Sequence, residues 1–497
     1  MKFECSSNKM EALDRGVVVV FATESDQVKG TYLKAIDAAA SGVLSDAFNS
    51  GEFAGKDGEV LAIANLDGFG TRRILIVGLG EQKKLCADSF RRAAGYLSRS
   101  KVLSQSESAA FFFGDMNDPA YVQAAVEGYL LGGFKHLDYK TGDASVDKRR
   151  LATIELAGDK AAWVRKAEKA AERGTIIAEG QLLVRRLAQT PAGHLTPRLY
   201  VKEVQKLARK YGFGFRALDE KAIAKERMGA FLGVAVGSEE PPRFLILEHK
   251  GGRDKQKPVV LVGKGVTFDS GGISLKPGLN MHEMKQDMAG SAVVVAALVT
   301  AARLGIKQNI VGLIPATENM PSGRATRPGD ILTSRKGKTI EIINTDAEGR
   351  LILADALDYA NEFDPQAVID LATLTGATLY ILGYAGAPIM GNNDKLLGRI
   401  EEASQATNEA VWKLPIWDDH REQMKSRIAD LVNSGGRPAG TIAAAAFLEN
   451  FIGDWPWAHI DIAAVDLEFS GKPYVPKGAS GFGLRLLVDV LSNWKRL

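Results

Sequence analysis

Residues 258–272 read PVVLVGKGVTFDSGG. The run at 259–262 is continuously apolar and rich in β-branched residues, which is typical of a strand covered on both faces of a largely parallel sheet. Lys264, between two glycines, and then Asp269 follow that strand directly. Ligands of open α/β sheets bind outside the carboxyl ends of the strands. The segment therefore predicts an α/β fold and the sheet edge at which a site would lie.

Further strand-like and helix-like segments extend this pattern over the second part of the chain. Helices are expected where apolar residues recur at helical spacing and a stop signal follows: residues 291–304 before Gly305, and 351–363 before Pro365. The short β-branched runs predict strands of the same sheet at residues 244–248, 310–315, 339–343, 367–371 and 458–462.

The first 160 residues alternate in the same way and predict a separate α/β domain. Strands are expected at 17–22, 60–64, 73–77, 109–113 and 154–156, and helices at 31–49, 89–98 and 121–131. An Ala-, Glu- and Lys-rich stretch then predicts a long helix, weakened by Gly174 and Gly180. We therefore expect an amino-terminal domain at 1–160, a connecting helix at 161–190 and a second domain at 191–497, which would carry the site at the sheet edge.

Composition narrows the class of protein. Of 497 residues, 45% are apolar and 25% charged, as in an ordinary globular protein. The formal net charge is +3, and residues 1–160 carry 20 basic and 22 acidic side chains, so no basic nucleic-acid arm is indicated. Two cysteines cannot staple a fold of this size, which favours the cytoplasm. The longest weakly polar stretch, 289–302, is shorter than the ~20 residues that span a bilayer, so no membrane partner is expected.

Four carboxylates gather on the predicted strand-end loops. Asp269 lies in the first loop, Asp287 in residues 284–290, and Asp346 and Glu348 in residues 344–350. Asp287 and Asp346 each precede a predicted helix, so either alone could be an N-cap worth about 1 kcal/mol. Together, four acids at one sheet edge would be costly to assemble without a compensating cation.

Two divalent metal ions would neutralise the four formal negative charges. None of the six histidines has the spacing of a metal-binding motif, so the ligands would be mainly oxygens. Oxygen-rich sites suit Mn²⁺ or Mg²⁺, and Zn²⁺ also accepts carboxylates. Two adjacent metals activate a water while polarising a carbonyl or phosphoryl group. Both a peptidase and a phosphohydrolase remain open at this point.

The loops also resemble a known family. The octapeptide NTDAEGRL at 344–351 matches the motif of the leucyl aminopeptidases, or cytosol aminopeptidases, which are dinuclear metallo-exopeptidases. The resemblance is strong over residues 160–497, whereas the amino-terminal third is similar only in size and α/β pattern. Further matching segments occur in the same order at 263–277, 284–290, 318–323, 327–330 and 370–377.

The resemblance implies two metal sites per subunit, with Mn²⁺ favoured and Zn²⁺ or Mg²⁺ also acceptable. The matching residues of the first site are Lys264, Asp269, Asp287 and Glu348. Asp269, Asp346 and Glu348 match the second. A lysine ligand must be neutral, because an ammonium has no lone pair. Burial beside two dications would depress its pKa.

The same resemblance implies a reaction. Water held by the metals attacks the scissile carbonyl, Lys276 stabilises the oxyanion, and Arg350 holds a bicarbonate that acts as general base. The substrate is a peptide with a free amino terminus, since that amine binds a metal. Met284, Thr373 and Gly376 match the pocket for the first side chain, which predicts a preference for leucine and other hydrophobic residues. A homohexamer is implied as well.

Two alternatives stay open. Some bacterial relatives combine peptidase activity with DNA binding, so a bifunctional DNA-binding regulator is one, although the charge of residues 1–160 does not indicate it. A two-metal phosphohydrolase is the other, because metal-bound carboxylate sites also serve phosphates.

Overall fold

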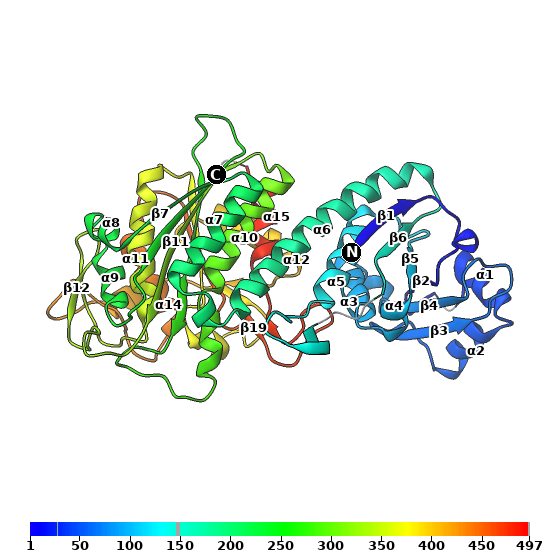
Figure 1. Ribbon diagram of the computed structural model, residues 1–497, viewed down its shortest axis with the longest axis horizontal. Helices are drawn as coiled ribbons and strands as arrows, with labels where there is room; N and C mark the ends of the chain where they lie inside the picture. The colour runs from blue at the N-terminus through cyan, green and yellow to red at the C-terminus, as the bar shows by residue number, and fades with distance from the viewer. Residues whose placement is uncertain (27, 146–149, 496–497) are drawn as a thin grey trace. The chain divides into compact units, whose positions relative to one another are not determined.

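The computed structural model describes residues 1–26, 28–145 and 150–495 (Figure 1). It divides into two compact units, each an α/β structure, which confirms the predicted fold class. The first unit comprises Met1–Glu179 with Ser470–Pro476, and the second comprises Gly180–Phe469 with Lys477–Leu497. Helix α6 (Ala161–Gln189) contributes to both and is continuous despite Gly174 and Gly180.

The first unit is built on a six-stranded sheet. Its order is β1 (Lys2–Ser6), β6 (Thr153–Ala157), β5 (Ser108–Phe112), β2 (Val17–Ala22), β4 (Arg73–Gly78) and β3 (Val60–Ala64). Neighbouring strands are parallel except for β3, which runs antiparallel to β4. The expected strands all form. Strand β1 was not predicted, because its five residues carry no continuous apolar run.

Helices cover both faces of this sheet. One face packs against α1 (Thr31–Ala39) and α2 (Val43–Ser50), and the other against α3 (Ala87–Leu97), α5 (Pro119–Gly132) and the start of α6. The single helix predicted at 31–49 is wrong. Ser41 and Gly42 have φ angles of 54° and 87°, and this left-handed pair separates α1 from α2.

The second unit contains a mixed nine-stranded sheet. Its order is β16 (Val411–Lys413), β15 (Ala387–Gly391), β18 (Trp457–Asp461), β14 (Ala367–Ala372), β9 (Val259–Gly263), β11 (Asn309–Asn319), β8 (Arg243–Lys250) and β7 (Gly214–Leu218), with β10 (Gly265–Asp269) beside β11. The central strands β18, β14, β9 and β11 are parallel. Strands β7 and β8 are antiparallel additions at one side.

One predicted strand belongs elsewhere. Residues 339–343 were expected in the main sheet, but β13 (Thr339–Glu341) pairs with β12 (Ile331–Thr333) and β17 (Leu431–Val432) in a separate three-stranded sheet. Only Ile340 of β13 is buried, so the strand has one covered face and does not fit between two helical layers.

The buried helix α10 (Ala289–Leu304) lies against the central strands and ends at Gly305, whose φ is 60°. On the other face, α9 (Gly229–Ala235), α11 (Glu348–Tyr359) and α14 (Gly440–Leu448) enclose a large apolar core. The remaining α-helices are α4 (Lys101–Gln105), α7 (Pro197–Tyr211), α8 (Glu220–Lys225), α12 (Asp394–Thr407), α13 (Asp418–Glu422) and α15 (Leu484–Ser492).

Within the described residues, one helical stretch passes a length and hydropathy test for a membrane span. It covers Met281–Leu304 and so combines a 3₁₀ turn, η5 (Met281–Gln286), with α10. Its most apolar window is 83% buried inside the protein. The apolarity of α10 is thus accounted for by packing on all sides.

Helices α3 and α5 pack so closely that glycine is required at their contact. A Cβ at Gly128 would lie 2.0 Å from the carbonyl oxygen of Arg91. The Cβ would be attached directly to the backbone of α5, and the carbonyl oxygen belongs to the backbone of α3, so neither atom can rotate away. In contrast, a Cβ at Gly398 of α12 would meet nothing within 4 Å.

We expect Gly128→Ala to lower the free energy of unfolding by about 1–3 kcal/mol, because the added methyl forces the helices apart. Gly398→Ala is the matched helical control and should be neutral or stabilising by up to about 1 kcal/mol. Denaturant unfolding followed by circular dichroism measures both. Equal stability of the Gly128→Ala variant and the wild type would contradict this close packing.

Candidate metal centre

The backbone around Lys264 is fixed from two sides. Its amide donates to the carbonyl of Leu371 in β14 at 3.1 Å, and its carbonyl accepts from the amide of Ser291 in α10 at 3.0 Å. A Cβ at Gly263 would lie 2.5 Å from the Cα of Ser291, so glycine lets α10 approach the strand end. Lys264 therefore enters the site from the best-packed part of the sheet.

The two aspartates that could have been N-caps are not caps. Helix α10 has Met288 as its N-cap residue and α11 has Ala347, and neither helix has a side-chain cap hydrogen bond. Asp346 instead sits in a turn in which its amide donates to Asn344 Oδ1 at 2.9 Å. The capping interpretation of Asp287 and Asp346 is wrong, and their carboxylates are directed to other groups.

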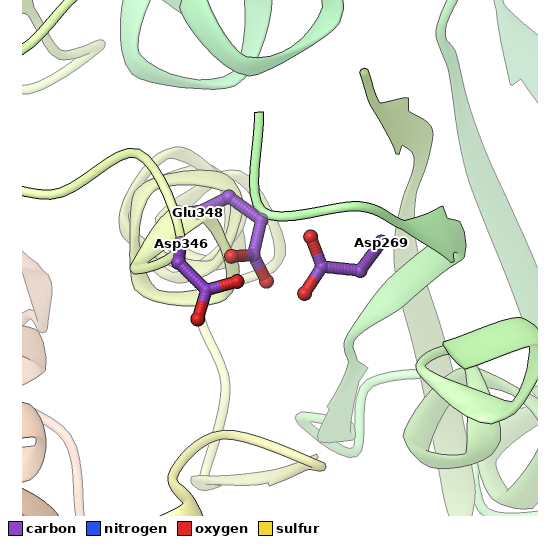
Figure 2. A group of neighbouring side chains, drawn as sticks. All are labelled: Asp269, Asp346 and Glu348. Carbon is purple, nitrogen blue, oxygen red and sulfur yellow. The ribbon is translucent and has the colours of Figure 1, made fainter. Parts of the chain in front are cut away.

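Three carboxylates converge. Asp269, at the end of β10, faces Glu348 at the start of α11 and Asp346 in the turn before that helix (Figure 2). One oxygen of each lies within 4.8 Å of the others. Glu348 and Asp269 are about 2% exposed and Asp346 is half-buried. This arrangement can hold a metal ion by carboxylate oxygens alone.

Two lysines balance the charge of the cluster. Lys264 Nζ lies 2.8 Å from Asp287 Oδ1 and 2.8 Å from Glu348 Oε1, and it donates to the carbonyl of Thr373 at 2.8 Å. Lys276 Nζ lies 2.8 Å from Asp269 Oδ2 and 2.6 Å from Asp346 Oδ1. Thus the four predicted carboxylates and both lysines form two sets of ion pairs, one around each lysine. The two sets meet where oxygens of Asp269, Asp346 and Glu348 lie close together.

These contacts shift the proton affinities of the cluster. Burial by itself lowers the pKa of Lys264, but the charges of Asp287 and Glu348 outweigh it and the net pKa is raised. Burial, reinforced by the other acids, also raises the pKa of Asp287 and Glu348 against the effect of Lys264. The cluster therefore holds protons tightly, and divalent cations would compete with those protons for the same ligand atoms.

The oxygens that remain are suited to cations. Asp287 Oδ2 and Glu348 Oε2 are buried without a hydrogen-bond partner. A buried carboxylate oxygen without a donor is costly, and a metal ion removes that cost. The residues present therefore fit divalent cations, with Lys264, Asp269, Asp287, Asp346 and Glu348 as the available ligands.

Arg350 lies in the first turn of α11, apart from these ion pairs. It is 7% exposed, and its Nη1 donates to the carbonyl of Asn433 at 2.7 Å. Its Nε is buried without a hydrogen-bond partner. Burial lowers the pKa of this guanidinium to about 10, so it remains charged near neutrality. A buried, charged donor of this kind suits a small anion.

The three predicted pocket residues differ in how they meet the cluster. Thr373 joins it directly, because its hydroxyl donates to Asp287 Oδ1 at 2.7 Å while its carbonyl accepts from Lys264. Met284 lies half-buried in η5, three residues before Asp287. Gly376 is exposed at the start of η7 (Gly376–Tyr380).

Supporting residues were not identified from the sequence. Asn319 Nδ2 donates to Asp269 Oδ1 at 2.9 Å and to the carbonyl of Thr345 at 3.0 Å, so it holds two loops together. Asp461 is fully buried and accepts from the hydroxyl of Thr375 at 2.7 Å. The segment at 318–323 had been noted, but nothing in the sequence assigns Asn319 to Asp269.

Comparison with known proteins gives consistent results for both units. The catalytic-domain model of the cytosol aminopeptidase family matches residues 182–488, and the N-terminal domain model matches residues 17–143. A probable cytosol aminopeptidase of Syntrophotalea carbinolica is 43% identical over 474 residues, which cover 94% of this chain and 95% of that protein. One from Geotalea uraniireducens is 42% identical, with 96% and 97% covered.

Solved structures of similar fold lead to the same family. A mutant of tomato leucine aminopeptidase superposes with a TM-score of 0.89 at 30% identity, covering 99% of this chain and 96% of that one. The bottromycin maturation enzyme BotP in complex with Mn superposes with a TM-score of 0.84 at 33% identity, covering 96% and 99%.

Space for Lys264 depends on Gly349. A Cβ at Gly349 would lie 2.7 Å from Lys264 Cε and 2.8 Å from Nζ. Since three contacts hold Nζ, we expect Gly349→Ala to displace it and to weaken Mn²⁺ binding by tenfold or more, a loss of ~1.4 kcal/mol. Calorimetric titration measures this, with Gly398→Ala as the helical control. Unchanged Mn²⁺ affinity of Gly349→Ala would show that Lys264 does not need this position.

Proposed function

The chain belongs to the cytosol aminopeptidase family and is an aminopeptidase, and we propose from this premise that it uses two divalent cations per subunit to release amino-terminal residues from peptides. Leucine and other hydrophobic residues are the proposed preference. The observation that carries the proposal is the buried carboxylate cluster with oxygens that lack a donor. Intracellular peptide turnover is the proposed role, in the cytoplasm.

The proposed ligands divide into two sets. Lys264, Asp269, Asp287 and Glu348 would hold one cation, and Asp269, Asp346 and Glu348 the other. The short distances among these groups support both sets. Mn²⁺ is favoured because the ligands are mainly oxygens and because the similar BotP structure contains Mn, while Zn²⁺ and Mg²⁺ also suit carboxylates.

When bound, such cations supply Lewis acidity for the scissile carbonyl and lower the pKa of water. Lys264 would serve as a neutral amine ligand, its proton being displaced as the cation binds. A peptide with an unblocked amino terminus can present a similar amine. If a cation must bind the amino terminus of the substrate, only the first peptide bond can be cleaved, which would make the enzyme an exopeptidase.

Lys276 is the proposed electrostatic catalyst. Its ammonium lies between Asp269 and Asp346, and its side chain is 22% exposed, so it can reach both the cluster and a substrate. The carboxylates raise its pKa against the opposing effect of burial, so it stays protonated. A fixed ammonium beside the scissile carbonyl would stabilise the negative charge that develops on its oxygen.

Arg350 is proposed to hold bicarbonate. The buried Nε without a hydrogen-bond partner supports a small anion here, and bicarbonate would supply a general base. Met284, Thr373 and Gly376 are proposed to line the pocket for the first side chain. An apolar pocket of this kind would discriminate only modestly among hydrophobic residues.

Asp346 provides the direct test of the ligand assignment. We expect wild-type protein to hydrolyse a leucyl anilide with Mn²⁺ and to lose activity in chelator, because the cations are required. Asp346→Asn should lower kcat by about 10² or more, since one charged ligand is lost. Comparable rates for the two proteins would refute the assignment. A phosphate ester hydrolysed faster than the anilide would favour the phosphohydrolase.

Lys276→Met should reduce kcat for leucyl anilide by about 10²–10³ while KM changes little, because the ammonium acts in the transition state. Mn²⁺ affinity, measured in parallel, should not fall, since Lys276 is not a proposed ligand. Lys285→Met is the control, because that lysine contacts only Glu283 among the described ion pairs. A change confined to KM would assign Lys276 to substrate binding instead.

A homohexamer is the proposed assembly. Analytical ultracentrifugation should give a mass near six times 53.4 kDa, and a mass near one subunit would contradict the proposal.

DNA binding is the remaining alternative. A duplex mobility shift that weakens steeply with salt would support it.

A further inference from the structure

The amino-terminal unit contains a cavity of about 400 Å³. It lies at the carboxyl ends of β2 and β5, and every lining residue belongs to this unit. Its volume is in the range of small-molecule sites, ~300–1,000 Å³. None of its residues takes part in the carboxylate cluster.

The strand order explains why a cavity forms here. The chain leaves β2 for α1 on one face of the sheet, whereas it leaves β5 for α5 on the other face. Strands β2 and β5 are parallel neighbours. Because the connections that follow them turn to opposite faces of the sheet, a crevice opens between their carboxyl ends. This is the topological switch point of the sheet, where α/β proteins bind ligands.

Five of the fourteen residues that line the cavity are aromatic. Phe21, Phe112 and Phe113 are buried, and Tyr32 and Tyr121 are half-buried. The Tyr32 ring meets that of Phe112 edge-on at 4.8 Å. Such surfaces receive a flat or branched apolar group, and their ring faces attract cations.

Charge in the cavity has one sign. Among the described residues that line it, Asp26 and Asp115 are the charged side chains, and none is a lysine or arginine. Asp26 is already engaged, since its Oδ2 accepts from the amide of Thr23 at 2.6 Å. Asp115 is exposed. Burial and then Asp159, which accepts from the Tyr32 hydroxyl at 2.8 Å, raise the pKa of that phenol, and the charge of Asp115 adds to their effect. The cavity therefore favours a positive group near Asp115 and disfavours phosphates and carboxylates.

We propose that this cavity binds a small organic cation, an ammonium group attached to an aromatic or branched apolar body. The ammonium pairs with Asp115 and the apolar body packs against Phe112, Phe113 and Tyr32. Binding here is independent of the carboxylate cluster in the other unit, so it goes beyond the proposed peptidase reaction.

Calorimetric titration of the Mn²⁺-loaded protein with phenethylamine and with 3-phenylpropanoate tests the proposal. The amine should bind and the acid should not, because the two share a phenylethyl group but carry opposite charges. Asp115→Asn should weaken amine binding about tenfold, whereas the exposed control Asp14→Asn should leave it unchanged. Leucyl anilide turnover should be the same in both variants.

The amine could instead bind the carboxylate cluster, and Asp346→Asn distinguishes the two locations. Equal amine affinity in Asp346→Asn and wild type supports the amino-terminal cavity. Loss in Asp346→Asn but not in Asp115→Asn overturns the proposal, as does equal binding of amine and acid or no binding at millimolar concentration.

A second readout reports from the cavity itself. Trp163 packs on the lining residue Phe113, with ring centroids 5.8 Å apart. In protein labelled with fluorotryptophan, phenethylamine should shift the ¹⁹F resonance of Trp163, which Trp163→Phe assigns. A shift confined to the other tryptophans overturns the proposal.

Discussion

Mutual repulsion among four acidic side chains is the constraint on which the second unit is organised. Asp269, Asp287, Asp346 and Glu348 come from separate segments, and burial makes their negative charge expensive. Lys264 and Lys276 offset it here through four ion pairs of 2.6–2.8 Å. Gly263 lets α10 approach the strand end, and backbone hydrogen bonds to Leu371 and Ser291 then fix Lys264 beside the acids.

The same constraint links structure to chemistry. A protonated Lys264 and a cation liganded by Lys264 are alternatives, because the nitrogen offers either a proton or a lone pair. The carboxylates that raise its pKa are the proposed ligands of the same cation. Without a metal, the protonated lysines neutralise the acids and stabilise the folded site. In the proposed metal-bound form, Lys264 loses its proton and the divalent cations neutralise the acids instead.

Much of this fold could be predicted because its central strands are buried on both faces. Residues 259–262 form a continuous apolar run, and residues 367–372 are apolar except for Asp370, as is typical of strands covered on both faces. Short or one-sided elements could not be predicted in the same way. Strand β1 has no apolar run, and β13 buries only Ile340. The break between α1 and α2 depends on two residues with positive φ, which amphipathic spacing does not reveal.

For the site, sequence identified the charged groups and missed those that orient them. The carboxylates and lysines stand out because strand-end loops rarely concentrate so much charge. Asn319 and Asn433 could not be assigned, since their partners are 50 and 83 residues away in the chain and meet them only after the sheet forms. The amino-terminal cavity was likewise invisible, because it arises from strand order and its aromatic residues appear in the sequence as ordinary core.

The first turn of α11 carries Glu348 and Arg350, and Asp346 precedes it by two residues. Two of the proposed site residues therefore share one rigid helix, and the third lies in the turn that leads into it. A drift of this helix during evolution would disturb all three together, so their relative placement is inherited as a unit. The exposed residues of η7, where Gly376 is proposed to line the substrate pocket, lie on a separate segment, so substitutions there would leave the placement of Glu348 and Arg350 unchanged.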